Sequence, residues 1–236
     1  MKRTIIAIAA TSCLAATAAV ADPALDGQLC VASQAGATDQ MRQLLQQGAD
    51  ANATCASKAG DDHFGPLYLA MKADTLDGVR ALLDAGAKVG AQETKYGLSA
   101  VFQIRSPAVG ELLFRRGADI NARNARGQTP FPYLTDRVGG TFTEDKAIPV
   151  GVLLLAHGAD VNAPVNDMSP LMEATTAQDT GYMAFLLDHG ANAAWRDKSG
   201  ESALGVAIRL QGMVRPEFTG GYHDAEALLR ARGAPP

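Results

Sequence analysis

The chain has 236 residues, with 21 Lys and Arg against 25 Asp and Glu, which gives a formal net charge of −4. This acidic balance argues against a general nucleic-acid binder, because sequence-independent affinity for phosphate backbones comes from a surplus of basic residues. Beyond the first 21 residues, the sequence has no apolar segment long enough to span a bilayer, so we expect no stable membrane insertion of the mature chain.

Residues 1–21 have the pattern of a secretory signal peptide. Lys2 and Arg3 precede an uncharged, Ala-rich run, and the sequence AVA at 19–21 is a small-x-small cleavage site. Cleavage after it leaves a mature domain, residues 22–236, with 19 basic and 25 acidic residues and a net charge of −6. The sequence therefore predicts an exported, periplasmic protein.

The three cysteines bear on this prediction. Cys13 lies within the export segment and opens the alternative of a lipoprotein, although Ala10 stands where a lipidation site has a large aliphatic residue. Cys30 and Cys55 remain after cleavage, and in an oxidising compartment such a pair tends to form a disulfide. The alternative is two free or intermolecular thiols. We expect an intramolecular disulfide that closes a loop of about 25 residues.

The phrase LLxxGA recurs six times along the mature chain. Its glycines are Gly48, Gly86, Gly117, Gly158, Gly190 and Gly233, with spacings of 38, 31, 41, 32 and 43 residues. A second phrase lies between them, in the forms GPLYLA from Gly65, LSAVFQ from Leu98, QTPFPYL from Gln128, MSPLMEA from Met168 and ESALGVA from Glu201. A recurring period near 33 residues with insertions indicates a repeat architecture.

With these two phrases the chain resembles the ankyrin-repeat family, in which a TPLHxA phrase opens the first helix and LLxxGA closes the second. The resemblance implies an all-α solenoid of about six helix-turn-helix units joined by β-hairpin-like turns, and it covers nearly the whole mature chain. The family's histidine is missing from every copy. The residues in its place are Tyr68, Phe102, Pro132, Met172 and Gly205.

Each phrase has a physical reason in such a fold. Glycine takes the left-handed conformation that ends a helix, and short polar side chains bond to nearby backbone in the turns; these are Asp119, Asn121, Asp160 and Asn162. Hydroxyls can cap the first helices; they belong to Ser99, Thr129, Ser169 and Ser202. The leucine pairs are expected to form one continuous core; they include Leu44, Leu45, Leu82, Leu83, Leu154, Leu155, Leu186 and Leu187.

The sequence contains no recognised catalytic or phosphate-binding motif, and we expect neither an enzyme nor a cofactor. His157 and His189 precede the glycines of successive copies, which allows a metal pair, but a histidine in the last helical turn is more simply explained by the helix dipole. A hydrolase using Asp61, Asp62 and His63 is a remote alternative, because nothing in the sequence orients these three side chains into an acid–base pair.

The expected function is protein binding by a monomer. Aromatic and arginine side chains at the hairpin tips are the candidate partner-binding residues; they are Tyr96, Arg123, Asn124, Arg126, Trp195, Arg196 and Lys198. Two insertions, residues 137–150 and 210–225, are a second candidate surface, since they are expected between the helices of alternate units and on one edge. Exported bacterial ankyrin proteins suggest support or protection of a partner enzyme, and an inhibitor or immunity protein is the alternative.

Overall fold

The computed structural model describes residues 22–56, 63–91, 97–131, 144–215 and 219–235. The first helices of the units are α1 (Pro23–Ala35), α3 (Pro66–Lys72), the 3-10 helix η1 (Ala100–Gln103), α8 (Pro170–Thr176) and α10 (Ala203–Met213). The second helices are α2 (Thr38–Gln46), α4 (Leu76–Asp84), α5 (Pro107–Arg115), α7 (Glu144–Ala156), α9 (Thr180–Asp188) and α11 (Gly220–Ala231). In the fourth unit, Pro130 and Phe131 are also helical.

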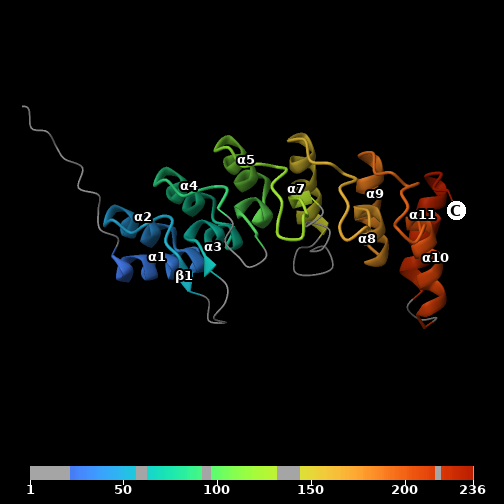
Figure 1. The fold of residues 1–236 in the computed structure, drawn as a ribbon, viewed down its shortest axis with the longest axis horizontal. Coiled ribbons are helices and arrows are strands. Elements are labelled where there is room, and N and C mark those ends of the chain that lie inside the picture. The colour runs from blue at the N-terminus through green and yellow to red at the C-terminus, as the bar shows by residue number, and fades with distance from the viewer. Residues whose placement is uncertain (1–21, 57–62, 92–96, 132–143, 216–218, 236) are drawn as a thin grey trace, which may run out of the picture.

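The helix pairs stack in chain order into one elongated row, with α1 and α2 at one end and α10 and α11 at the other (Figure 1). First helices pack on first helices, as α1 does on α3, and second helices pack on second helices, as α2 does on α4. Each unit therefore buries its apolar side against its neighbours, as expected for a solenoid. This arrangement confirms the predicted all-α repeat architecture.

The second helices end as predicted. All six glycines of the LLxxGA phrases have a positive φ, between 74° and 99°, where side-chain-bearing residues are strained. In each case the backbone N–H of the residue after the glycine donates to a carbonyl inside the helix, as Ala118 does to Leu113 at 3.0 Å. This hydrogen bond closes the helix and turns the chain into the next hairpin.

Serine side chains start two of the first helices. The hydroxyl of Ser169 accepts a hydrogen bond from the backbone N–H of Met172, and that of Ser202 accepts one from Gly205. Ser99 forms no such cap. In its unit, 18 residues separate Ser99 from the glycine at position 117, against 21 between residues 65 and 86. The unit lacks almost one helical turn, so its first helix shrinks to η1.

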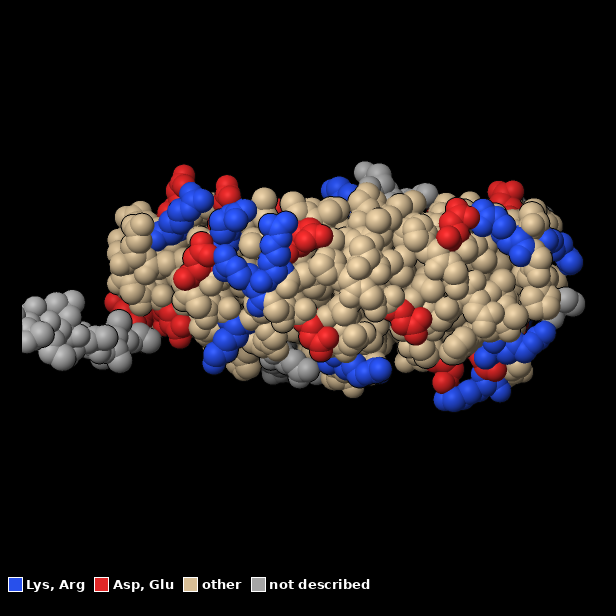
Figure 2. Space-filling view, turned by 90° about the horizontal axis from the view of Figure 1, so that it is seen from above, with Lys and Arg blue, Asp and Glu red and all other residues tan. Residues whose placement is uncertain are grey.

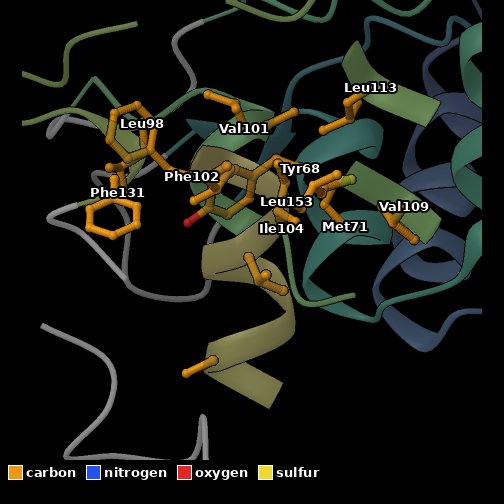
Figure 3. Close-up of a cluster of buried hydrophobic side chains, with 14 of the residues drawn as sticks. Tyr68, Met71, Leu98, Val101, Phe102, Ile104, Val109, Leu113, Phe131 and Leu153 are labelled. Carbon is orange, nitrogen blue, oxygen red and sulfur yellow. The ribbon is translucent and has the colours of Figure 1, made fainter. Parts of the chain in front are cut away.

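Apolar side chains from consecutive units form a single core. Figure 3 shows its middle part, where Tyr68 and Met71 of α3, Phe102 of η1, Leu113 of α5 and Leu153 of α7 lie together. All of these side chains are buried. The eight leucines predicted for the core are all within it or packed against it. The described units therefore share one hydrophobic core.

The N-terminal unit is tied to the first hairpin by a disulfide. Cys30 of α1 and Cys55 of the short strand β1 (Cys55–Ala56) are joined, with their Cα atoms 5.6 Å apart. Strand β1 pairs antiparallel with β2 (His63–Phe64), so Cys55 lies opposite Phe64. The disulfide holds this hairpin against α1, as the cysteine pairing in the sequence predicts.

The two insertions, which were expected between the helices of their units, are partly helical. Residues 144–150 form the first half of α7, and residues 210–213 and 220–225 extend α10 and α11. The extensions pack on each other, since the side-chain amide of Gln211 donates to the carbonyl of Tyr222 and to Glu226 at 3.1 and 2.8 Å. Residues 137–143 and 216–218 lie outside the described part.

Candidate protein-binding surface

Residues 123–128 form a hairpin tip that is closed by Asn124. The backbone N–H of Asn124 donates to the carbonyl of Gln128 at 3.0 Å. Its side-chain Oδ1 accepts hydrogen bonds from the backbone N–H groups of Arg126 and Gln128, at 2.9 and 3.0 Å. Its amide nitrogen donates to Oε1 of Gln128 at 2.6 Å. Asn124 is 7% exposed, so it holds the tip together from inside.

Residues 196–201 form a second tip with the same closure. The backbone N–H of Asp197 donates to the carbonyl of Glu201 at 3.0 Å. Its carboxylate accepts from the N–H groups of Ser199 and Glu201, at 2.8 and 2.9 Å, and from the Ser199 hydroxyl at 2.7 Å. The Ser199 hydroxyl, followed by the backbone donors, lowers the pKa of Asp197, because these bonds favour the charged carboxylate.

In each tip, an exposed arginine side chain donates a hydrogen bond to a carbonyl of the same tip. Nη1 of Arg123 donates to the carbonyl of Gly127 at 2.7 Å, and Nη1 of Arg196 donates to that of Gly200 at 2.9 Å. Both glycines have a positive φ, 75° and 81°, which the turn requires. The two guanidinium groups are exposed and held in defined positions by their own tips.

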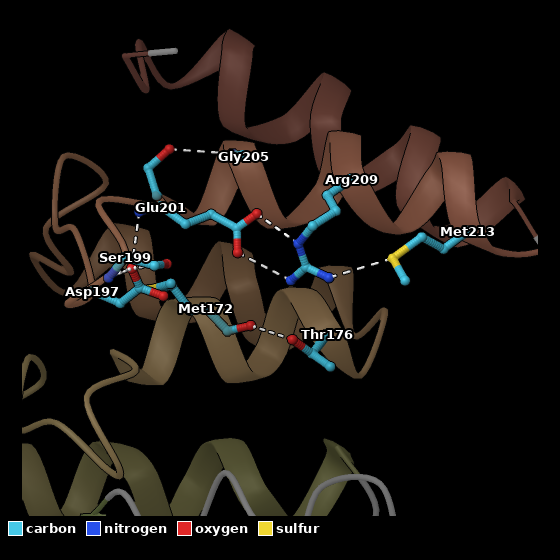
Figure 4. A network of polar contacts seen from close by, with 9 residues as sticks. Met172, Thr176, Asp197, Ser199, Glu201, Gly205, Arg209 and Met213 are labelled. Carbon is cyan, nitrogen blue, oxygen red and sulfur yellow. Dashed lines mark hydrogen bonds and ion pairs between the residues drawn. The ribbon is translucent and has the colours of Figure 1, made fainter.

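The second tip is connected to its surroundings on both sides. Lys198 pairs with Asp167 of the preceding hairpin, with Nζ 2.6 Å from Oδ2. On the other side, Arg209 of α10 pairs with both carboxylate oxygens of Glu201, at 2.7 and 3.0 Å (Figure 4). The tip is therefore anchored to its own unit and to the one before it.

Trp195 immediately precedes the second tip. Its ring is partly buried and packs against the core, and its Nε1 is buried without a hydrogen-bond partner in the described part of the chain. It is the only tryptophan of the sequence. Large aromatic side chains of this kind carry binding energy at many protein interfaces.

A groove of about 1020 Å³ lies at the N-terminal end of the stack. One wall is the face of α1 that contains Gly27 and Val31, and the other is formed by Phe64 of β2 and Leu69 of α3. The disulfide partner Cys30 also lines it. Val31 is 66% exposed at this groove.

This geometry matches solved ankyrin-repeat domains. The chain is similar to the ankyrin repeat domain of Bcl-3, a member of the IkappaB protein family, with a TM-score of 0.68 and 26% sequence identity over 89% of this chain and 87% of that chain. The chain has the ankyrin-repeat fold. It is also similar to an ankyrin repeat domain from Acinetobacter baumannii AYE, with a TM-score of 0.64 and 24% identity over 88% of this chain and 98% of that one. No family model matches the sequence.

The ankyrin fold is a protein–protein interaction module, and the candidate residues differ in what they can offer to a partner. Asn124 is buried in its tip, and Trp195 is partly buried. Arg123, Arg126, Arg196 and Lys198 are exposed. Tyr96 lies outside the described residues. The ankyrin hairpins thus present exposed cations on rigid turns.

The histidines of the ankyrin units have local structural partners. His157 stacks on Phe114 of the preceding unit, with ring centroids 4.1 Å apart, and its Nε2 lies 3.3 Å from Oε1 of Glu111. His189 contacts the carbonyl of Phe185 through Nδ1 at 2.7 Å. Among the described residues there is no group of three side chains suited to hold a metal ion.

The remote catalytic candidates are only partly described. His63 lies exposed on β2, opposite Ala56, and Asp61 and Asp62 fall outside the described residues. In the described part of the chain, no helix combines the length and the apolar character needed to cross a bilayer.

Sequence reasoning missed the groove beside α1. Its signal was present in the first helix, where Gly27 and Val31 lie on one face four residues apart. The groove lies where the first hairpin, linked to α1 by the disulfide, and α3 flank this face. No sequence pattern shows the relative placement of a helix and a hairpin at that level of detail.

Proposed function

We propose that this ankyrin-repeat protein is exported to the periplasm, where it binds a partner enzyme and supports or protects it. It acts as a binding protein and carries out no chemistry of its own. The observation that carries the proposal is the pair of hairpin tips, 123–128 and 196–201, which present arginine and lysine side chains on turns that are already fixed. The partner surface is expected to be acidic where it meets these cations.

Rigid tips favour binding for an energetic reason. Ordering a flexible side chain at an interface costs about 0.5–1.5 kcal/mol, which lowers the affinity that its contacts can provide. Arg123 and Arg196 are held in place before any partner arrives, because each donates to a carbonyl of its own tip. Lys198 is likewise positioned by Asp167. The tips therefore lose little conformational freedom on binding.

Export is supported by two independent features. Residues 1–21 have the composition of a signal peptide. Cys30 and Cys55 form a disulfide, and disulfides persist in oxidising compartments and are rare in the cytosol of most organisms. Both features are expected for a periplasmic protein.

A pull-down from periplasmic extract tests the proposal. The mature chain is immobilised, bound proteins are identified by mass spectrometry, and the affinity of a recovered partner is measured for the double variant Arg126→Ala with Lys198→Ala. We expect about a tenfold loss or more, because interface arginines of this kind contribute about 1–2 kcal/mol. Arg80→Ala, on the outer side of α4, is the matched control and should leave the affinity unchanged.

The activity of the captured enzyme distinguishes support from inhibition. A partner that stays active, and that survives heat or oxidant longer in the complex, agrees with the proposal. If the partner enzyme is inactive in the complex and active after release, this chain is an inhibitor or immunity protein instead. If the double variant and Arg80→Ala bind equally well, the tips are not the binding surface.

A further inference from the structure

Two equivalent positions of the second helices are exposed or half-buried in every unit, but the residues there differ in chemistry along the stack. Counting back from the glycine that ends each second helix, the sixth residues are Arg42, Arg80, Glu111, Val152, Ala184 and Ala227, and the ninth are Asp39, Asp77, Ala108, Pro149, Gly181 and Asp224. In the first two units these positions form Asp–Arg pairs across one helical turn, at 3.2 and 3.9 Å. The fold therefore accepts charged side chains at these two positions of a second helix.

The fourth and fifth units carry no charge at these positions. On α7 they are Pro149 and Val152, and on α9 they are Gly181 and Ala184. Residues 147–156 of α7 and 180–187 of α9 contain no Lys, Arg, Asp or Glu. Val152 is 46% exposed, and Pro149 and Ala156 are also exposed. The corresponding residues of α9, Gly181 and Ala184, are half-buried. We call the residues Pro149, Val152, Ala156, Gly181 and Ala184 the uncharged face.

The core does not need these side chains. Val150, Leu153 and Leu154 already fill the buried side of α7, and Tyr182 and Leu186 fill that of α9. Helices α7 and α9 pack against each other, so their outward residues make one continuous surface. Figure 2 shows the molecule from above Figure 1: basic and acidic side chains are dense over its left half and gather again at its right end, and the area between them carries few. Exposed apolar residues that lie together can form part of an interaction site.

The size of the uncharged face favours a single helix over a second copy of the chain as the bound element. The stretch from Pro149 to Ala156 covers about 10 Å at 1.5 Å per residue, and two helices packed about 10 Å apart give a width of about 20 Å. The resulting area of about 200 Å² is well below the ~800 Å² per partner of a stable protein dimer. A second copy of the chain would leave most of its interface unsupported, whereas about two turns of a single helix match the available length.

The border of the face carries a cation. Arg115 of α5 occupies the place that Ala156 has in the next unit, two residues before the terminal glycine. Its side chain is 78% exposed, and its guanidinium lies 4.0 Å from Glu111, at the limit of an ion pair. An acidic residue on the bound element can therefore pair with Arg115 at little desolvation cost. The opposite border, on the side of α11, is formed by the ion pair between Asp188 and Arg232 at 2.6 Å.

We propose that the uncharged face of α7 and α9 binds an amphipathic helix of a partner protein, whose apolar stripe lies on Val152 and Ala184 and whose acidic edge faces Arg115. Helix-in-groove recognition uses apolar residues spaced three, four and seven apart, which fits the two rows of outward residues. This site is built from second helices and is separate from the hairpin tips. It rests on the proposed function in requiring that the chain be exported and that the partner be a protein.

Photo-crosslinking in the periplasm tests the proposal directly. The photoreactive residue p-benzoylphenylalanine replaces Ala156 in the full chain, the cells are irradiated, and the crosslinked peptides are sequenced. We expect crosslinks to residues spaced three or four apart within a single segment of one partner protein. Crosslinks to a second copy of this chain, to lipid, or to an extended segment overturn the proposal, as does their absence.

Charge placed on the face provides the second readout. Val152→Glu with Ala184→Glu should lower the crosslinking yield from position 156 at least tenfold. Ile208→Glu on α10 is the matched control, since Ile208 is 45% exposed against 46% for Val152, and its yield should stay within twofold. Equal yields in both variants overturn the proposal.

If the glutamates impair folding, as judged by thermal melting, serines at the same two positions replace them. The double variant Arg126→Ala with Lys198→Ala should leave the crosslinking yield at position 156 unchanged. It therefore distinguishes failure of this proposal from failure of the hairpin tips as a binding surface.

Discussion

Asn162 joins two consecutive repeats, because its side-chain amide nitrogen donates to the carbonyl of Gly190 at 3.3 Å. Its Oδ1 accepts from the backbone N–H of Asn192 at 2.7 Å. Asn52 has the same role between the first and second units. Its amide nitrogen donates to the carbonyl of Gly86 at 3.1 Å, and its Oδ1 accepts from the backbone N–H of Lys88 at 2.8 Å. These asparagines satisfy backbone groups of the following hairpin and fix the spacing between units.

The second unit has Gly90 in place of this asparagine, and Gly90→Asn should stabilise the protein. The position has an ordinary φ, and a Cβ there meets no atom within 4 Å. The new side chain can reach the carbonyl of Gly117 and the N–H of Asp119, as Asn52 reaches its own partners. We expect a gain of about 1–2 kcal/mol in the free energy of unfolding, from two hydrogen bonds and the loss of glycine's freedom in the unfolded chain.

Urea unfolding of the wild type, Gly90→Asn and Gly90→Ala measures this gain. The alanine variant separates the two contributions, because it restricts the unfolded chain without adding a side-chain hydrogen bond. If the alanine variant gains as much as the asparagine variant, no bridge has formed.

Gly110→Ala should be destabilising. Gly110 is buried on α5, where it faces the next unit, and a Cβ there would collide with Leu153 of α7 and lie 3.0 Å from Ile104. Both neighbours are themselves buried, so they have little room to move. Overpacking of this kind costs about 1–3 kcal/mol. Thermal and urea unfolding measure the loss, and Gly117→Ala provides a comparison in which the cause is backbone strain at positive φ and no collision occurs.

Removal of the disulfide should lower stability by about 3 kcal/mol on the loop-entropy estimate, given its 25-residue separation. The variant with Cys30→Ser and Cys55→Ser, compared with the oxidised wild type in urea, measures this difference. Wild type unfolded in the presence of a reductant should match the variant. A difference below about 1 kcal/mol would mean that α1 and the hairpin stay together without the covalent link.

The tip at 196–201 should respond to acid where the tip at 123–128 does not. Because the pKa of Asp197 is lowered in the folded state, its contribution is present above the ordinary carboxyl pKa of about 3.9 and is lost as the pH falls through the lower folded value. Fluorescence of Trp195, next to the tip, should therefore change below about pH 4. Asn124 closes the other tip with a side chain that does not titrate.

Asp197→Asn provides the control for this prediction. An asparagine can accept the same backbone hydrogen bonds, as Asn124 does. In that variant, Trp195 fluorescence should stay constant until the helices unfold, which far-ultraviolet circular dichroism follows separately. An unchanged acid transition in the variant assigns it to another group.

The repeat phrases predicted most of the fold, because helix ends and core positions follow from local chemistry. The glycine at position 117 must adopt positive φ, and leucines such as Leu82 and Leu154 must be buried, in any stack of these units. The short η1 was not predicted, since three missing residues leave the apolar pattern of the unit intact. The helical character of residues 144–150 was also missed, because a segment with Gly-Gly before it resembles a loop.

The candidate site was harder to predict, since it depends on how side chains meet. Asn124 has the sequence context of an exposed turn residue, yet Gln128 folds over it and buries it. The uncharged face was visible in principle as ten consecutive uncharged residues, 147–156, but only the register of α7 against α9 shows which of them point outward.

The single covalent link of the stack lies at one end. Cys30 and Cys55 fasten the first unit to the first hairpin, whereas α10 and α11 close the other end by packing and polar contacts, such as that between Gln211 and Glu226. In a row where each unit is supported mainly by its neighbours, a unit without a crosslink has the lower local stability. We therefore expect the backbone amides of α10 and α11 to exchange faster than those of α1, which the disulfide holds.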